Sequence, residues 1–182
     1  MPRQLLRDNQ IVIDDWQYLT ELEPGVATGV AAAAAAAPVV APTATIEGAG
    51  LIIPFDRWRT ERDRWLAHPG RLGVVLLPAH KVEQLAPDLA HFALVAAEFP
   101  GPTDGRGYTQ GRLLRERYQF RGELRAAGYV RRDQLFFLAR CGFNSFQLAE
   151  NELAGAATAF STYTAEYQPA NDEGLPHKLR HR

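Results

Sequence analysis

Apolar runs of strand length alternate with amphipathic segments of helix length along most of this chain. The runs cover residues 51–55, 71–78, 91–99, 122–130 and 144–149, and each is followed by a segment with helical spacing of apolar positions. Five strand-then-helix units in succession predict an α/β domain with a mostly parallel sheet. The runs are continuously apolar and do not alternate, which is typical of strands that are buried on both faces.

Two architectures fit this pattern, and the sequence leaves both open. Because crossovers between parallel strands are right-handed, the sheet is either half-barrel-like or open and doubly wound. In both cases the functional edge lies outside the carboxyl ends of the strands. We expect that edge to hold Asp56, the corner at residues 78–80, Glu98, the loop 103–109, residues 128–134, and Glu150 with Asn151.

The first 50 residues and the last 14 depart from the pattern. Residues 10–22 have β-favouring side chains on both sides of the turn-prone pair Asp14 and Asp15, which predicts a small hairpin in an N-terminal extension of residues 1–25. Residues 26–50 are rich in alanine and predict a low-complexity linker, because alanine offers little surface to anchor a core. The α/β domain is expected to span residues 51–168, followed by a flexible tail of residues 169–182.

Composition narrows the class of protein. A chain of 182 residues with 46% hydrophobic and 23% charged residues buries a full core. Its net charge of −1 argues against nucleic acid as a partner. No run of about eighteen apolar residues and no secretory signal occurs, so we expect no membrane association. The single cysteine, Cys141, cannot form an internal disulfide, and a reducing cytoplasm is the expected location.

Residues 103–122 (TDGRGYTQGRLLRERYQFRG) follow a predicted strand and begin a helix. Gly105, Gly107 and Gly111 come close to the dinucleotide fingerprint, but the last glycine is one residue late. The next strand also ends without the acidic residue that would hold a ribose, and no Walker sequence occurs. The sequence therefore requires no cofactor, and a flavin or nicotinamide nucleotide is the less favoured alternative.

Arginines supply the stronger signal. Between residues 106 and 140 there are nine arginines and three acids. Arg106 in the loop and Arg131 with Arg132 at the next helix start fall on the same sheet edge, where backbone N–H groups and helix dipoles favour an anion. A guanidinium fork suits phosphate, sulfate, sulfite or carboxylate. The candidate anion- or cofactor-binding residues are Arg106, Tyr108, Arg131, Arg132, Asp133 and Gln134, with Arg125 and Cys141 as further candidates.

In this hypothesis Tyr108 and Gln134 form hydrogen bonds with the ligand, and Asp133 orients a neighbouring arginine. Arg112, Arg115 and Arg117 lie in the body of the predicted helix and are interpreted as a solvated face that pairs with Glu116.

Two further candidates have competing interpretations. Arg125 interrupts a buried strand and needs a partner, either Glu123 or Asp133, so a structural ion pair and a functional arginine are equally open. Cys141 is interpreted first as a small buried hydrophobe, and second as a thiol activated by Arg140. The five histidines lack metal-ligand spacing, and no nucleophile with an adjacent base is recognisable, so neither a metal site nor a hydrolase is expected.

Five short motifs follow one another between residues 105 and 146: Gly-Arg-x-Tyr, Leu-Arg-x-Arg, Gly-Glu-Leu-Arg-Ala, Asp-Gln and Arg-Cys-Gly-Phe. In these motifs the chain resembles the uncharacterised bacterial family called domain of unknown function 934, over roughly residues 51–168. It departs from the family pattern at Thr109, Gly111 and Asn144, where serine, alanine and aspartate are usual. The last departure removes a charge.

The resemblance implies a cytoplasmic accessory protein of assimilatory sulfite reduction, because members are typically encoded beside assimilatory sulfite reductase. The family has no established reaction. The first hypothesis is therefore a binding module whose basic sheet edge holds an oxyanion, a phosphorylated cofactor or the acidic face of a redox partner such as sulfite reductase. The alternatives are a flavin- or nicotinamide-dependent oxidoreductase of the same pathway, and a purely structural partner of sulfite reductase.

Overall fold

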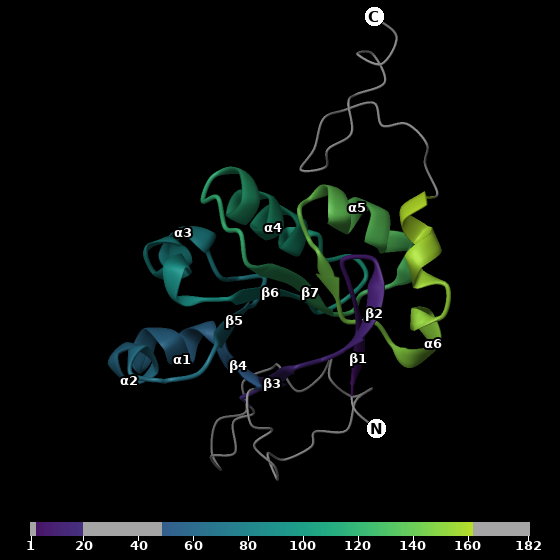
Figure 1. Ribbon diagram of the computed structural model, residues 1–182. Coiled ribbons are helices and arrows are strands. Elements are labelled where there is room, and N and C mark those ends of the chain that lie inside the picture. The colour runs from purple at the N-terminus through teal and green to yellow at the C-terminus, as the bar shows by residue number, and fades with distance from the viewer. Residues whose placement is uncertain (1–2, 20–48, 162–182) are drawn as a thin grey trace, which may run out of the picture.

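A curled sheet with helices along one side forms the body of the protein (Figure 1). The computed structural model describes residues 3–19 and 49–161. Within these residues the sheet has eight strands in the order β2-β1-β8-β7-β6-β5-β4-β3. The strands are β1 (Gln4–Arg7), β2 (Gln10–Ile13), β3 (Trp16–Tyr18), β4 (Gly50–Pro54), β5 (Leu72–Leu76), β6 (Leu94–Phe99), β7 (Glu123–Gly128) and β8 (Ser145–Phe146).

The strands from β3 to β8 are parallel and lie side by side in chain order. Because right-handed crossovers between successive neighbours all return over the same face, the helices collect on one side of the sheet. The predicted mostly parallel α/β fold is therefore confirmed, and the sheet is the half-barrel of the two alternatives. The helices are α1 (Phe55–Thr60), α2 (Arg62–Leu66), α3 (Val82–Leu85), α4 (Arg106–Glu116), α5 (Leu135–Arg140) and α6 (Glu150–Leu153), with the 3-10 helices η1 (Ala86–His91), η2 (Arg132–Gln134) and η3 (Ala156–Ser161).

The two faces of the sheet bury different side chains. Val74 and Val95 point toward the helices and belong to the main core. Leu94 and Ala96 point to the concave face, where they pack with Trp16 in a smaller cluster. This explains the continuous apolar runs, because a half-barrel buries both faces of its strands.

The predicted N-terminal hairpin is present, but the predicted turn at Asp14 and Asp15 is wrong. The hairpin joins β1 to β2 through Asp8 and Asn9, whose φ angles are +48° and +64°. Asp and Asn tolerate this left-handed region better than other non-glycine residues, and two such residues suit a two-residue hairpin turn. Because β1 also pairs with β8, the hairpin is an integral part of the sheet.

Asp14 and Asp15 connect the two edges of the sheet. They separate β2 at one edge from β3 at the other, and three residue steps span at most about 11 Å. Asp14 N–H donates to the carbonyl of Arg3 at 2.8 Å, and the Asp15 carbonyl accepts from Gly50 N–H at 3.0 Å. The sheet therefore curls until its edges lie near each other at this end.

Two predicted segments fall largely or wholly outside the described residues. The predicted linker of residues 26–50 is described only at residues 49 and 50, and the predicted tail of residues 169–182 is not described.

Candidate functional site

Arg106 and Tyr108 lie in the first turn of α4, next to the carboxyl end of β6. The Arg106 guanidinium binds Asp104 through two hydrogen bonds of 3.0 and 2.6 Å. These bonds hold the pKa of the Asp104 carboxyl below its usual value. Tyr108 packs edge-on against Phe99 with ring centres 5.4 Å apart, and burial raises the pKa of its phenol. Arg106 thus already has an anionic partner within the protein.

Residues 131–134 form the second half of the predicted site, at the carboxyl end of β7. Arg131 Nε lies 3.9 Å from Asp133 and 3.8 Å from Glu152. Arg132 donates to the carbonyl of Ala154 at 3.2 Å. The Gln134 side chain accepts from the backbone N–H of Arg131 at 3.0 Å, so its carbonyl oxygen is used in capping.

The two halves of the predicted site are linked electrostatically at Tyr108. Asp133 and Cys141 both contribute to the raised pKa of the Tyr108 phenol, after burial. Both halves lie at the carboxyl edge of the sheet, but carboxylates already accompany Arg106 and Arg131.

Cys141 is half-buried at the end of α5. Burial raises the pKa of its thiol, and this outweighs the lowering effect of Arg112 and Arg140. A reactive thiolate needs a lowered pKa, and Cys141 packs against the main core, so the packing role is favoured over the activated thiol.

Arg125 lies in the middle of β7 and is fully buried on the concave face. It forms two hydrogen bonds with Asp14, of 3.0 and 2.9 Å, and two with Glu123, of 3.1 and 2.8 Å. Burial lowers the pKa of the guanidinium. Tyr18, Asp14 and Glu123 together raise it by more than burial lowers it, so the net shift of the pKa is upward. Of the two predicted partners, Glu123 is correct, and Asp14 takes the place of Asp133. Arg125 thereby fixes the link between the sheet edges and is a structural residue.

The glycines of the fingerprint-like loop serve mainly packing. A Cβ at Gly107 would overlap the ring of Phe99, and one at Gly111 would overlap the ring of Phe143. Only Gly105, the residue before α4, faces open space. A dinucleotide turn needs glycine backbone that is accessible to the pyrophosphate. Gly107 and Gly111 instead bring α4 close to the strand β6 and to the chain after α5.

Arg112 and Arg115 lie in the body of α4 but have different surroundings. Arg112 pairs with Glu116 at 2.8 Å on the exposed surface, as predicted. Arg115, predicted to share that solvated face, turns inward and donates to the carbonyls of Gly142, Phe120 and Gly122 at 2.8, 2.6 and 2.9 Å. The prediction for Arg115 is wrong, because nearby carbonyls at the end of α4 offer a fixed set of acceptors.

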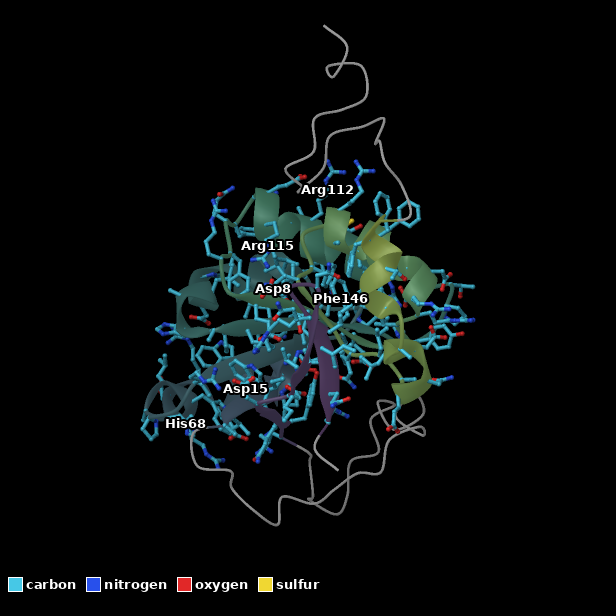
Figure 2. All side chains as sticks on the ribbon, turned by 45° about the vertical axis from the view of Figure 1, so that its right-hand side comes forward. Asp8, Asp15, His68, Arg112, Arg115 and Phe146 are labelled. Atoms are coloured by element: carbon cyan, nitrogen blue, oxygen red, sulfur yellow. The ribbon has the colours of Figure 1, made fainter. Side chains whose placement is uncertain are left out.

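We call the set Arg112, Arg115, Arg117, Arg121 and Arg140 the arginine face. Figure 1 shows that α4 and α5 lie beside each other in the helix layer, and both Arg112 and Arg140 act electrostatically on Cys141. In Figure 2, Arg112 lies on the outer side of this layer and Arg115 lies further toward the strands, near Asp8. Residues 105–122 contain one acid, Glu116, and residues 134–149 contain none.

A shallow groove of about 260 Å³ lies between α3 and α4. Gln110 crosses its base and donates to the carbonyls of Leu77 and His80, both at 2.9 Å. Arg106 and Lys81 also line the groove, which has a mixed wall: Pro78, His80, Lys81, Val82, Glu83, Arg106, Thr109, Gln110 and Leu113.

Glu98 is a half-buried carboxyl at the end of β6, on the concave face. No described residue forms a hydrogen bond or ion pair with it, and burial raises its pKa above the usual 4.5. Because the raised pKa means that the folded state binds the proton more tightly, Glu98 stabilises the fold below about pH 4.5 and this stability is lost as pH rises through the folded-state pKa.

We therefore expect Glu98→Gln to raise the free energy of unfolding at pH 7 and to leave it unchanged near pH 4. The amide keeps the shape of the carboxyl and carries no charge to desolvate. Urea denaturation of both proteins at the two pH values measures the difference. Equal stability at pH 7, or the same gain at both pH values, would contradict the assignment of Glu98 as a buried carboxyl without a partner.

In the two described ranges, no three histidine, cysteine or acidic side chains gather as metal ligands would. None of the helices in those ranges is long and apolar enough to span a bilayer.

The fold and the surface together define an α/β half-barrel protein with a concentration of arginines on its helix layer. Residues 73–178 match the family described as "Bacterial protein of unknown function (DUF934)". Because the match covers more than half of the sequence, the chain belongs to this family. The matched range includes every candidate site residue, from Arg106 to Cys141. No curated protein matches the chain.

Proposed function

We propose that this protein is a cytoplasmic accessory of assimilatory sulfite reduction, which acts by binding an anionic surface or ligand and not by catalysis. The observation that carries the proposal is the arginine face, whose five arginines come from two segments, residues 105–122 and 134–149, that together contain one acid, Glu116. The sulfur pathway and sulfite reductase as the partner rest on the family resemblance. Clustered guanidinium groups attract acidic partner surfaces and make the encounter sensitive to salt.

The arginine face suits this role better than the carboxyl edge does. Arg106 is paired with Asp104, and Arg131 lies between Asp133 and Glu152. An incoming anion would have to compete with these carboxylates. In the arginine face Arg112 is also paired, with Glu116, but Arg117 and Arg121 are exposed and have no carboxylate partner among the described residues. The carboxyl edge remains the site for a phosphorylated ligand in this proposal, through the groove that Arg106 and Lys81 line.

The packing of Gly107 and Gly111 supports a binding protein over the oxidoreductase alternative. A purified protein that carries flavin colour, or that changes the fluorescence of reduced nicotinamide nucleotides, would favour the oxidoreductase instead.

The proposal is tested by measuring how tightly the protein binds immobilised sulfite reductase, once at low salt and once at physiological salt. We expect binding that weakens steeply with salt, and a loss of about tenfold or more for Arg112→Glu combined with Arg117→Glu, because like charges then face the acidic partner. Arg59→Glu is the matched control, since Arg59 is exposed on α1, away from the arginine face.

Both variants are first compared with the parent protein by thermal melting, so that a loss of fold is not mistaken for a loss of binding. Absence of binding would overturn the proposal. Binding that is independent of salt, or lost equally in Arg59→Glu, would favour the purely structural partner.

A further inference from the structure

A hollow of about 590 Å³ opens at the C-terminal end of α4, and two of its five lining residues are arginines. It is larger than the groove between α3 and α4. A volume of this size accommodates a small hydrated anion. The hollow is lined by Arg115, Glu116, Gln119, Arg121 and Gly142.

Arg115 is fixed in the wall of the hollow without a carboxylate. Besides the three backbone carbonyls, its guanidinium donates to the Asn144 side-chain oxygen at 3.2 Å. The guanidinium has five N–H groups, and these four hydrogen bonds leave one N–H free. All four acceptors are neutral, so the guanidinium of Arg115 is held in place without a direct carboxylate partner among the described residues, although the charge of Asp8 acts on it.

The turn after α4 brings a second guanidinium to the hollow. Gln119 has a φ of +53°, a left-handed conformation that is uncommon outside glycine. Its side chain holds this turn by donating to the Glu116 carbonyl at 2.7 Å and accepting from Arg121 at 2.8 Å. Arg121 thereby stays near Arg115 while the rest of its guanidinium is exposed.

The two guanidinium groups act on each other as like charges. Burial lowers the pKa of Arg115, and Arg121 lowers it further, while Asp8 opposes both. The acid in the wall of the hollow, Glu116, is engaged by Arg112 at 2.8 Å. A pair of like charges beside an open hollow is relieved by an anion that contacts both.

We propose that this hollow binds a small oxyanion of the phosphate or sulfate class between Arg115 and Arg121. Arg115 supplies a fixed charge and one free N–H, and Arg121 supplies the guanidinium N–H groups that Gln119 does not hold. The site deepens the proposed function by naming a ligand class for one part of the arginine face, and only its biological role rests on that function.

Calorimetric titration of the full chain with sodium phosphate and with sodium sulfate, at constant ionic strength, tests the site. We expect saturable binding, weakened about tenfold or more in Arg121→Gln, because a charge-assisted contact to the anion is removed. Arg59→Gln is the control, since it removes an exposed arginine from α1 and is expected to bind as the parent does.

Asn144→Asp is a second variant, whose fold is first checked by thermal melting because the substitution removes the amide N–H that donates to Asp8 Oδ1 at 3.2 Å. The aspartate keeps the oxygen that accepts from Leu124 N–H at 2.8 Å and from Arg115, but it places a negative charge beside the guanidinium. We expect phosphate and sulfate binding to weaken in this variant too. Parent protein that shows no saturable binding, or equal weakening in Arg59→Gln, would overturn the site.

The outcomes separate this site from the proposed function. Binding of sulfite reductase without binding of phosphate or sulfate would refute the oxyanion site and leave the docking proposal intact. Binding of phosphate without binding of sulfite reductase would support the oxyanion site and refute the docking proposal.

Discussion

Replacing Arg125 with methionine should lower the free energy of unfolding by about 3–5 kcal/mol, the usual result of removing one partner from a buried ion pair. Arg125 is completely buried, and the Asp14 side chain is 1% exposed. Methionine fills similar space but leaves the Asp14 carboxylate buried without its two strongest hydrogen bonds. Because Asp14 joins the two edges of the sheet, the substitution destabilises the contact between these edges. Urea denaturation followed by circular dichroism measures it.

The matched control is Arg112→Met, which breaks the exposed pair with Glu116 and should cost less than about 1 kcal/mol. Adding Asp14→Asn to Arg125→Met should restore part of the lost stability, because the stranded charge is then removed. A loss for Arg125→Met no larger than that of the control would show that the buried pair does not hold the sheet edges together.

Replacing Arg115 with methionine should cost about 1.5–3 kcal/mol, the range for hydrogen bonds from a charged group. The carbonyls of Phe120, Gly122 and Gly142 lose their donor together, and the turn between α4 and β7 loses its anchor. Arg115→Lys should not restore this stability, since an ammonium cannot reproduce the planar fork that reaches all three carbonyls. The same denaturation measurement applies.

Arg112→Met again serves as the control, three residues away on the same helix. If Arg115→Met were as mild as that control, Arg115 would belong to the solvated face that the sequence predicted.

The sequence predicted the five strand-then-helix units well, because their apolar runs and helical spacing are local signals. It left the half-barrel open, since strand order depends on contacts between distant residues. The hairpin turn was misplaced because two pairs, Asp8 with Asn9 and Asp14 with Asp15, have similar turn chemistry. The connection at Asp14 and Asp15 is recognisable only once the sheet is curled.

The site was predicted less completely than the fold. Asp104 and Asp133 are chain neighbours of Arg106 and Arg131, but Glu152, which also lies near Arg131, belongs to α6 beyond α5 and β8. The sequence does not indicate which arginines these carboxylates occupy. Asp14 is 111 residues away from Arg125, so no local pattern indicates the pair.

The position of Arg115 was also missed, because its acceptors are backbone carbonyls, which every residue carries. A signal was nevertheless present: Arg115 lies in the Leu-Arg-x-Arg motif and Gly142 in the Arg-Cys-Gly-Phe motif. The hydrogen bond between them joins the two motifs in space.

Nuclear magnetic resonance of the ¹⁵N-labelled protein, titrated with sulfite reductase, tests most directly whether the arginine face is the binding surface. We predict that amide signals lose intensity first at residues 112–121 and 140–142. Loss concentrated at residues 104–108 and 131–134, or no selective loss at all, would contradict the account.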